Sequence, residues 1–405
     1  MVQETENIDF REEFQNIVES DNQERLCDFL DEQNISDVAE LIHDHPENET
    51  LIISCMSIHR AASVFKILEL ANQKRIIKEL PPSKTAALLN ELPPDDRTDF
   101  FEELPSSVVR ELIKLLNTEE RKVALSLLGY PENSVGRLMT PDYIYVYEEN
   151  TVAEVLEIIR RKGKDSETID VIYVINRKGE LLDDIRIREF LLASPGKMVS
   201  DIMDGRYIAL NAFDDQEQAN EVFKMNNRVA LPVISNSNKL LGIVTIDDIL
   251  WVAEEEFSED IQKIGGTVAL EAPYLDTPFF KLIQKRIGWL VILFLSELLT
   301  ATAMAYFNDE IAKATMLAMF IPLIMSSGGN SGSQASTLII QAMAVGEVHI
   351  SDWWRVMRRE ILSGLLLGAA LGLIGFTRIT IWHELMQHGV LKDIYGPSWL
   401  LVALT

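Results

Sequence analysis

The 405-residue sequence is long enough for several domains, and its formal net charge of −26 excludes the basic surface typical of nucleic-acid-binding proteins. The charge is uneven, because residues 1–280 hold 55 acidic and 28 basic side chains, whereas residues 281–405 hold 8 and 9. The first part should therefore repel nucleic acid and anionic lipid and attract cations. Solubility alone is the alternative explanation of its charge.

The cysteines and the N-terminal segment both indicate a reducing cytosol. Cys27 and Cys55 are the two cysteines of the sequence, and neither has the spacing of a metal-ligand pair. We therefore expect neither a disulfide framework nor a structural zinc site. The N-terminal segment is rich in Glu and Asp and lacks the basic start and the apolar core of a signal peptide.

A Glu-Leu-Pro motif recurs every twelve residues, at 79–81, 91–93 and 103–105. Each unit predicts one short helix, because proline is tolerated in the first turn and polar residues there can satisfy free backbone amides. Stacked short helices form a superhelical solenoid, and we assign residues 1–130 to this all-α repeat. One helix start crowds three acids, Asp95, Asp96 and Asp99, where the helix dipole alone would also favour them.

From about residue 131 the pattern changes to strands alternating with a helix, and it occurs twice, over residues 131–196 and 197–256. The second copy ends in the run Leu241 to Asp248. This α/β pattern resembles a tandem pair of CBS domains, a family that commonly senses adenine nucleotides or ions.

The resemblance implies nucleotide contacts, with ATP as the expected ligand class, at Arg188, Glu189 and Thr245. The first copy departs from the family pattern, since Asp183, Asp184 and Arg186 stand where glycine, an apolar residue and a small hydroxyl residue are usual. That departure counts against nucleotide binding in the first copy.

Residues 257–284 are expected to form a connecting helix that follows an acidic stretch. Glu256, Glu259 and Asp260 share one helix face by their i, i+3, i+4 spacing, so their carboxylates would repel one another. A divalent cation relieves that repulsion, and Mg²⁺ is usually held by one or two carboxylates while it keeps several waters. A solvated linker helix is the alternative.

Residues 285–405 are expected to form an α-helical transmembrane bundle. Three stretches are long and apolar enough to span a bilayer, at roughly 287–307, 314–345 and 361–382, and a fourth begins near residue 399 without being completed. Basic residues precede the first and third spans, which places those ends in the cytosol. They are Lys281, Lys285 and Arg286, and Arg355, Arg358 and Arg359. The membrane expected is the bacterial inner membrane.

The second span is interrupted by a polar, glycine-rich stretch from Ser326 to Thr337. Backbone outside helical hydrogen bonding is tolerated in a membrane only where it faces protein or water, so the stretch could line a pore. Close packing of helices on small residues is the alternative. The candidate pore residues are Pro322, Gly328, Gly329, Asn330, Gly332 and Gln334.

The run Pro322 to Gln334, the Trp289 to Leu293 opening of the first span and the order of the domains together resemble the MgtE magnesium channel family. The resemblance implies a homodimer in lipid, with five spans per subunit and a central pore for Mg²⁺ that closes when internal Mg²⁺ is plentiful. Asn227 and Trp251 stand where the family carries two further acids. The acids that match its regulatory Mg²⁺ positions are Asp95, Asp99, Asp248, Glu256, Glu259 and Asp260.

Two other functions remain open at this point. An exchanger that couples cation export to an ion gradient needs an intramembrane ionisable residue, and Glu297 in the first span is the candidate. A membrane-anchored nucleotide sensor would need no pore. The sequence has no nucleophile with a neighbouring base, no phosphate-binding glycine loop and no zinc-spaced histidine pair, so we do not expect an enzyme.

Overall fold

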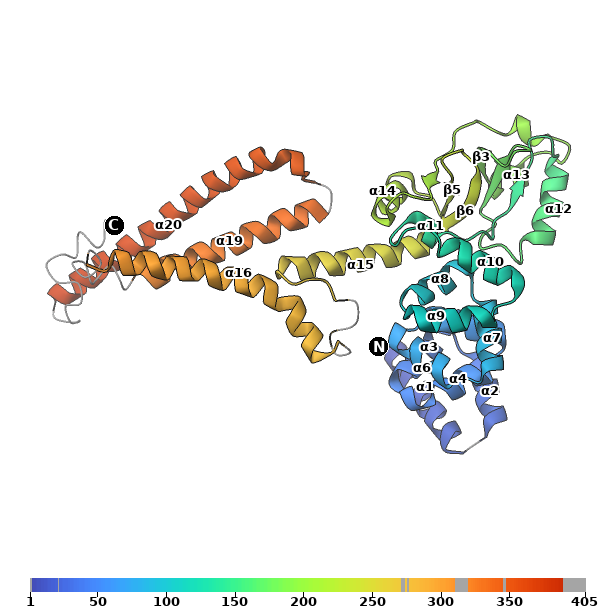
Figure 1. Ribbon diagram of the computed structural model, residues 1–405, viewed down its shortest axis with the longest axis horizontal. Helices are drawn as coiled ribbons and strands as arrows, with labels where there is room; N and C mark the ends of the chain where they lie inside the picture. Colours follow the sequence, from blue (N-terminus) through green and yellow to red (C-terminus); the bar gives the residue numbers. More distant parts are fainter. Residues whose placement is uncertain are drawn as a thin grey trace. The chain divides into compact units, whose positions relative to one another are not determined.

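The computed structural model describes residues 2–20, 22–270, 274, 277–309, 320–344 and 347–388. Its contacts divide the chain into two units, Met1–Glu254 and Glu255–Thr405. Figure 1 shows short helices and two small sheets in the first unit, and long helices in the second.

The first unit begins with a run of short helices. Most of them pack mainly on the helix two positions away, as α3 does on α5 and α5 on α7, which is the stacking that the twelve-residue motif predicted. Prolines start α7 and α8 in the tolerated first-turn position. The helices are α1 (Val2–Glu19), α2 (Gln23–Glu32), α3 (Ile35–Asp44), η1 (Pro46–Asn48), α4 (Glu49–Cys55), α5 (Ile58–Lys66), α6 (Leu70–Glu79), α7 (Pro82–Glu91), α8 (Pro94–Glu102), α9 (Ser106–Leu112), η2 (Ile113–Leu115) and α10 (Thr118–Leu127).

One continuous core runs through these helices. Leu30, Val38 and Ile52 are fully buried at its beginning, and Phe65 and Phe100 stack edge to face further along. Burial of each such side chain is worth about 1.5–3 kcal/mol. The all-α repeat that the sequence predicted is confirmed.

Two three-stranded sheets with the same topology follow. In each, the first strand is parallel to the second and the second is antiparallel to the third, in the orders β1-β2-β3 and β4-β5-β6. The CBS pair is therefore confirmed as an α/β repeat. Its elements are α11 (Val135–Leu138), β1 (Tyr145–Val146), α12 (Val152–Lys162), β2 (Val171–Ile175), β3 (Leu181–Arg186), α13 (Ile187–Leu192), η3 (Val199–Asp201), β4 (Leu210–Asn211), α14 (Gln216–Asn226), β5 (Ala230–Ile234) and β6 (Leu240–Thr245).

The two sheets share a core. Val171 and Tyr173 of β2 pack in one cluster with Ala230 of β5 and Ile243 of β6. A backbone bridge between Glu180 and Lys239 joins the two hairpin ends. The repeat therefore behaves as one packed body rather than as two separate domains.

The long helix α15 (Ile246–Ile264) starts directly after β6 and continues into the second unit. The further helices of the second unit are α16 (Phe279–Tyr306), α19 (Ile321–Ala344), η4 (Ile350–Asp352) and α20 (Trp353–Gln387). The expectation of a connecting helix over residues 257–284 is wrong. That helix begins earlier, at residue 246, and ends before Gly265 and Gly266, and the next helix begins after Pro278. Glycine with positive φ is a common helix terminator, and proline suits a helix start.

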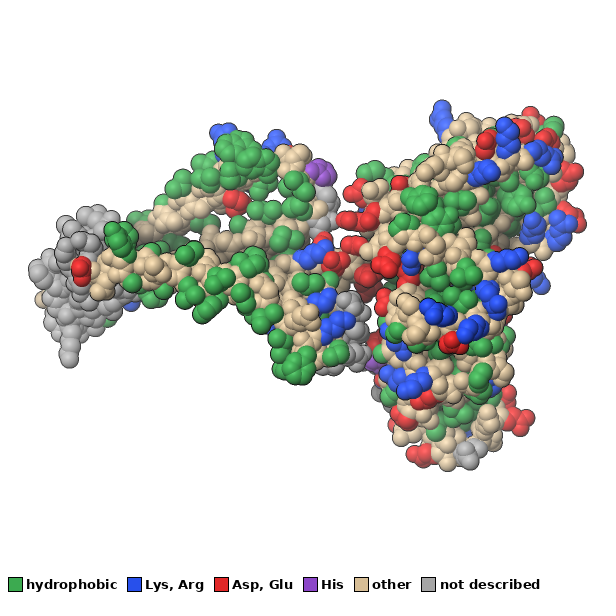
Figure 2. Space-filling model, viewed as in Figure 1, with side chains coloured by type: hydrophobic (Ala, Val, Ile, Leu, Met, Phe, Trp, Pro, Cys, Tyr) green, Lys and Arg blue, Asp and Glu red, His purple; other side chains and the backbone are tan. Residues whose placement is uncertain are grey.

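Two helical segments of the described part are long and apolar enough to cross a membrane, Phe279–Tyr306 and Ile350–Gln387. Figure 2 shows hydrophobic side chains over α16 and α20. The second predicted span lies partly outside the described residues, and the fourth lies wholly outside them. Of the second span, α19 is a continuous helix through Gly328 and Gly332, so the loosened backbone that glycine permits there is not observed.

Candidate cation site

Two helix starts bring acidic side chains together within the first unit. Asp95 and Asp96 lie in the first turn of α8, and Asp247 and Asp248 lie in the first turn of α15. Figure 1 shows α8 at the end of the helical repeat that adjoins the CBS pair, where it packs against α11. An ion pair between Glu102 of α8 and Arg137 of α11 ties the two parts together.

Asp95 is the most deeply buried acid of this cluster, with 6% of its surface exposed. Its Oδ1 atom has no hydrogen-bond partner in the described part of the chain. Burial raises the pKa of Asp95 well above its usual value, and the charges of Asp248, Asp96 and Glu167 raise it further. A buried carboxylate of this kind needs either a proton or a cation.

Asp248 is held by Thr245 at the end of β6. The Thr245 hydroxyl donates to Asp248 Oδ2 at 2.8 Å, and the Thr245 amide donates to the same oxygen at 3.3 Å. Burial nevertheless raises the pKa of Asp248 to about 7, because the two hydrogen bonds only partly oppose it and Asp247 and Asp96 add negative charge. Asp248 therefore holds its proton more tightly than an exposed aspartate does.

One lysine lies among these acids. Lys66 Nζ of α5 lies 3.3 Å from Asp96 Oδ2. Burial opposes its charge, yet the pKa of Lys66 is raised, because Asp96, Glu167 and Asp247 surround the ammonium group. Burial also raises the pKa of Asp96 and of Glu167 in spite of the Lys66 charge. A single lysine thus leaves a surplus of negative charge.

The chemistry of this acidic cluster fits a hydrated hard cation. Among the described residues, no group of three or more His, Cys, Asp or Glu has the arrangement that holds a metal ion directly. Mg²⁺ keeps several of its waters and is usually bound by one or two carboxylates, so it does not require such a group. Asp95 and Asp248, whose charges interact from the starts of α8 and α15, are the carboxylates best placed to hold it.

The acids predicted on α15 beyond the CBS pair belong to the second unit. Glu256, Glu259 and Asp260 share one helix face, and Glu259 Oε1 lies 2.6 Å from Lys263 Nζ one turn further. The pKa of Lys263 is raised by its hydrogen bond to Glu259 and by the charges of all three acids. Lys263 thus supplies part of the positive charge that relieves the repulsion among these three carboxylates.

The candidate nucleotide contacts are spread over two sites. Arg188 and Glu189 are exposed on α13 and pair with each other at 3.2 Å, whereas Thr245 is buried and donates a hydrogen bond to Asp248.

Asp183 stands where the family usually has glycine, and its carboxylate accepts hydrogen bonds from the backbone amides of Asp204 and Gly205. The unusual acid at position 183 thus has a structural role.

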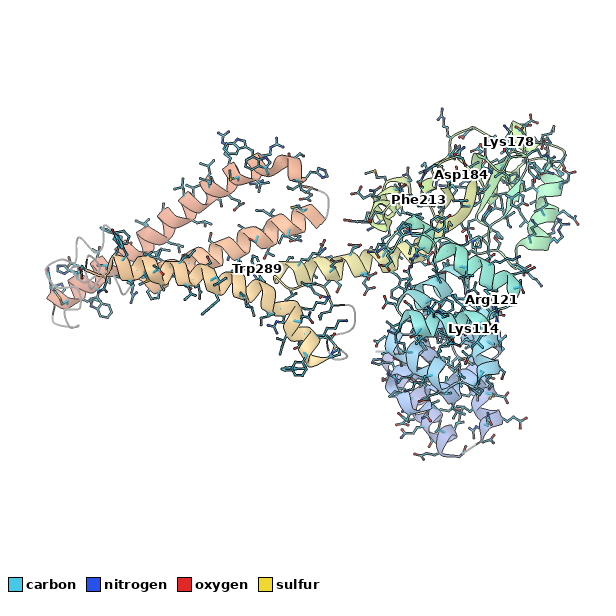
Figure 3. The ribbon with its side chains drawn as sticks, viewed as in Figure 1. Lys114, Arg121, Lys178, Asp184, Phe213 and Trp289 are labelled. Carbon is cyan, nitrogen blue, oxygen red and sulfur yellow. The ribbon has the colours of Figure 1, made fainter. Side chains whose placement is uncertain are left out.

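The neighbouring Asp184 is fully buried on β3 (Figure 3), where Arg228 Nη1 lies 2.9 Å from its Oδ2 atom. Burial raises the pKa of Asp184 to about 6 against the Arg228 charge. The ion pair fills space inside the CBS pair.

Two positions that lack the family's acids have local explanations. Asn227 ends α14 with φ of 48°, a left-handed conformation that asparagine tolerates better than most residues. Trp251 lies on α15 with 62% of its surface exposed. Neither residue takes part in the acidic cluster.

In the second unit, the pore candidates lie along α19. Pro322 is in its first turn, and a Cβ atom added at Gly328, Gly329 or Gly332 would meet no atom within 4 Å. Asn330 and Gln334 follow on the same helix, and Glu297 lies exposed on α16. The smooth face of α19 is therefore available for helix packing or for a pore.

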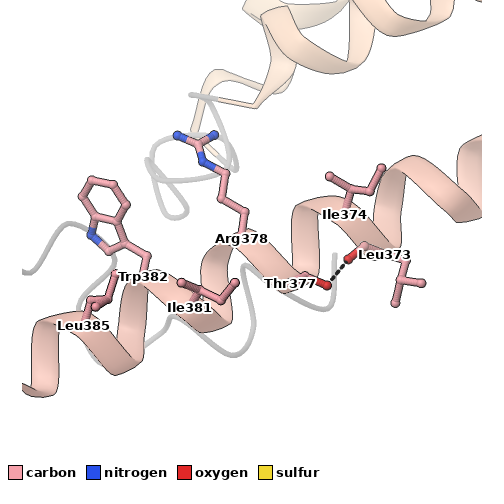
Figure 4. A pocket seen from close by; sticks show the side chains of 7 residues that line it. All are labelled: Leu373, Ile374, Thr377, Arg378, Ile381, Trp382 and Leu385. Carbon is pink, nitrogen blue, oxygen red and sulfur yellow. Dashed lines mark hydrogen bonds between the residues drawn. The ribbon is translucent and has the colours of Figure 1, made fainter.

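A separate hollow lies along α20 and is not a cation site (Figure 4). Among the described residues that line it, the hydroxyl is that of Thr377, which donates to the Leu373 carbonyl oxygen at 2.7 Å, and the charge is that of Arg378, which repels cations. The lining residues are Leu373, Ile374, Thr377, Arg378, Ile381, Trp382 and Leu385.

The structure brings together Asp95 and Asp248, two of the acids singled out from the sequence, with partners that the sequence reasoning missed. Asp99 is exposed, one turn beyond Asp95 on α8. The missed partner with a sequence signal is Asp247, which adjoins Asp248. Glu167 and Lys66 gave no signal, because they come from a loop and a helix far away in the sequence.

Comparison with known proteins agrees with this architecture. The helical repeat matches the MgtE intracellular N domain over residues 33–133, and residues 321–404 match the divalent cation transporter family MgtE. The CBS domain matches twice, over residues 135–196 and 199–255.

Magnesium transporters MgtE are among the similar curated proteins. The one from Thermus thermophilus is 35% identical over 293 residues, which are 72% of this chain and 64% of that protein. The one from Bacillus subtilis is 28% identical over 66% of this chain and 59% of that protein. The chain thus spans about three fifths of the length of these relatives.

A solved structure of the cytosolic domain of the Mg²⁺ channel MgtE in complex with ATP is 31% identical, with a TM-score of 0.57, and covers 59% of this chain and 98% of that one. The soluble part of a magnesium transporter shares the fold at 23% identity and a TM-score of 0.58, and covers 62% of this chain and 99% of that one. With the N domain, the CBS pair and the transporter segment in one order, the chain belongs to the MgtE family.

Proposed function

We propose that the protein is a channel-type transporter for Mg²⁺ uptake that is closed by cytosolic Mg²⁺. The observation that carries this proposal is the acidic cluster of the first unit, in which Asp95 is buried with an unpartnered oxygen. A stable protein does not keep such a group uncompensated without a ligand or a proton. The role is transport rather than catalysis.

Mutual repulsion of the acids supplies the gating force. Without a cation, ionised Asp95 and Asp248 repel each other and disfavour the state in which the starts of α8 and α15 lie close together. Mg²⁺ bound between them favours the packed state, and it closes the pore if it binds that state more tightly than the splayed one. Because α15 continues into the second unit, its start and its acidic face belong to one helix. Several weak sites acting together would make the response steep.

The acidic face of α15 should contribute to the same response. Replacement of Glu256 and Glu259 by alanine is expected to raise the cytosolic Mg²⁺ concentration for half-inhibition several-fold, because two carboxylates that attract the ion are lost. Flux into proteoliposomes measures this shift. Glu254→Ala, on a different side of the helix, is the matched control, and unchanged inhibition in the double variant would contradict the role of this face.

Passive flux distinguishes a channel from the alternative, an ion-coupled divalent cation exchanger regulated by nucleotide at the CBS pair. The measurement is Mg²⁺ flux into proteoliposomes without a sodium or proton gradient, while Mg²⁺ on the cytosolic side is varied. A channel gives flux that falls as cytosolic Mg²⁺ rises. Flux only with a counter-gradient would support the exchanger, and Glu297→Gln should then abolish it.

The membrane part and the assembly complete the proposal. A homodimer in the bacterial inner membrane, with its acidic domains in the cytosol, would let two copies of α19 face each other, so that Asn330 and Gln334 line a pore for hydrated Mg²⁺. ATP is a possible ligand of the CBS pair, because the similar cytosolic domain binds it. The Asp184–Arg228 ion pair would compete with a nucleotide for space inside the pair.

A further inference from the structure

The fold brings together the two cysteines of the sequence. Cys27 lies on α2, Cys55 is the last residue of α4, and these helices pack against each other. Cys55 Sγ lies 4.0 Å from the Gln23 carbonyl oxygen. In an α-helix that carbonyl accepts the amide of the residue four positions later, which is Cys27. Both thiols therefore border the same turn of α2, close enough for Cys27 to affect the pKa of Cys55.

The surroundings leave both thiols accessible to small reagents but disfavour the thiolate form of Cys55. Both side chains are free and half-buried, so a small reagent can reach them. Burial, reinforced by the neighbouring Cys27 thiol, raises the pKa of Cys55 to about 12, although the hydrogen bond to Gln23 and the positive charge of Lys84 oppose the rise. Lys84 is held nearby by its hydrogen bond to the Ser54 carbonyl oxygen at 3.2 Å.

We propose that Cys27 and Cys55 are a reversible dithiol–disulfide site in the helical repeat, oxidised by small-molecule disulfides. The proposal is independent of transport. It requires that the two sulfur atoms, which border the same turn of α2 on packed helices, rotate into bonding geometry.

Exchange proceeds in two balanced steps. The Cys27 thiolate attacks one sulfur of the oxidant, such as oxidised glutathione, and forms a mixed disulfide while one glutathione thiolate leaves. The Cys55 thiolate then attacks the Cys27 sulfur and releases the second glutathione. The protein loses two protons and two electrons, and the oxidant gains them. Once Cys27 is capped, its charge and its hydrogen bond no longer raise the Cys55 pKa, which favours the second step.

The disulfide would staple α2 to α4 across the chain segment that contains α3. Closing this loop restricts the unfolded chain, so oxidation should raise the melting temperature of the first unit by roughly 5–10 °C. The acidic cluster draws on α5, α8 and α15 instead, so the Mg²⁺ response should change little. This separation keeps the test independent of the proposed channel function.

The test is a redox titration of the purified full chain in detergent with reduced and oxidised glutathione, followed by acid quenching, alkylation and mass spectrometry. We expect one internal disulfide between Cys27 and Cys55 that is reversed by reduced glutathione. Cys55→Ser should trap a glutathione adduct on Cys27. In Cys27→Ser, the remaining Cys55 should form its glutathione adduct at least about tenfold more slowly than Cys27 does in Cys55→Ser, because burial disfavours the Cys55 thiolate.

Two results would overturn the proposal. One is a chain that collects two glutathione adducts and no internal disulfide, which would show that the thiols react independently. The other is a folded chain whose thiols stay reduced under conditions in which the same chain oxidises in urea. Lys84→Gln serves as a further check, because loss of its charge should slow the second step while both single adducts still form.

Discussion

Replacement of Asp95 by asparagine should leave Mg²⁺ flux high at cytosolic Mg²⁺ concentrations that close the unchanged protein. Asparagine keeps the shape of the side chain but removes the charge that an ion between α8 and α15 would meet. A contact with a charged group is worth roughly 1.5–3 kcal/mol, so the half-inhibiting concentration should rise about 10- to 100-fold. Asp248→Asn should act in the same direction, and flux into proteoliposomes measures both.

The same substitution, Asp95→Asn, should make the metal-free protein more stable. The pKa of buried Asp95 is raised, so the folded state binds its proton more tightly than the unfolded state does, and stability falls as pH rises. For Asp248 this loss accumulates between the ordinary value of 3.8 and about 7. Metal-free Asp95→Asn should therefore melt several degrees higher than the unchanged protein at pH 8, with a smaller difference at pH 6.

Added Mg²⁺ should stabilise the unchanged protein more than it stabilises Asp95→Asn. Added Mg²⁺ is expected to raise the melting temperature of the unchanged protein more at pH 8 than at pH 6, because protons compete for the same carboxylates, and to raise that of Asp95→Asn little. Asp99→Asn, exposed one turn along α8, is the matched control. Equal effects at positions 95 and 99 would point to general loss of negative charge and would contradict a site at Asp95.

The helical repeat, the CBS pair and the apolar helices could be predicted because their signals are local. The Glu-Leu-Pro spacing predicts helix starts, and α7 and α8 begin at the prolines that follow it. The acidic cluster could be predicted only in part. Glu167 and Lys66 join it through folding, and the exposure of Asp99 depends on which face of α8 meets the CBS pair, which spacing alone does not determine.

The junction between α15 and α16 shows a second limit of sequence reasoning. The sequence analysis expected a connecting helix over residues 257–284 after the acidic stretch, but Gly266 adopts φ of 67° just after α15 ends. The chain then folds back within the second unit. The Val268 amide donates to the Lys285 carbonyl oxygen at 3.2 Å, and Lys285 Nζ donates to the Ala269 carbonyl oxygen at 2.9 Å. The end of α15 is thus tied to the start of α16.

Replacement of Gly266 by alanine should uncouple pore closure from Mg²⁺ binding. A Cβ atom at Gly266 would lie 2.3 Å from Cδ1 of Trp289 on α16 (Figure 3), and positive φ adds about 1–2 kcal/mol of strain. The turn that ties α15 to α16 would have to open. We expect flux to persist at inhibiting Mg²⁺, with the half-inhibiting concentration raised about tenfold, while the Mg²⁺-dependent melting shift of the first unit stays unchanged.

Two comparisons separate the steric clash from the backbone strain. Gly265→Ala meets its nearest atom at 3.3 Å and has no positive φ, so it should leave closure intact. Addition of Trp289→Ala to Gly266→Ala removes the clash but keeps the strain, so it should restore part of the Mg²⁺ response. No recovery in the double variant would mean that the turn conformation, rather than its packing on Trp289, transmits movement from α15. Full inhibition in Gly266→Ala alone would mean that the two helices are coupled elsewhere.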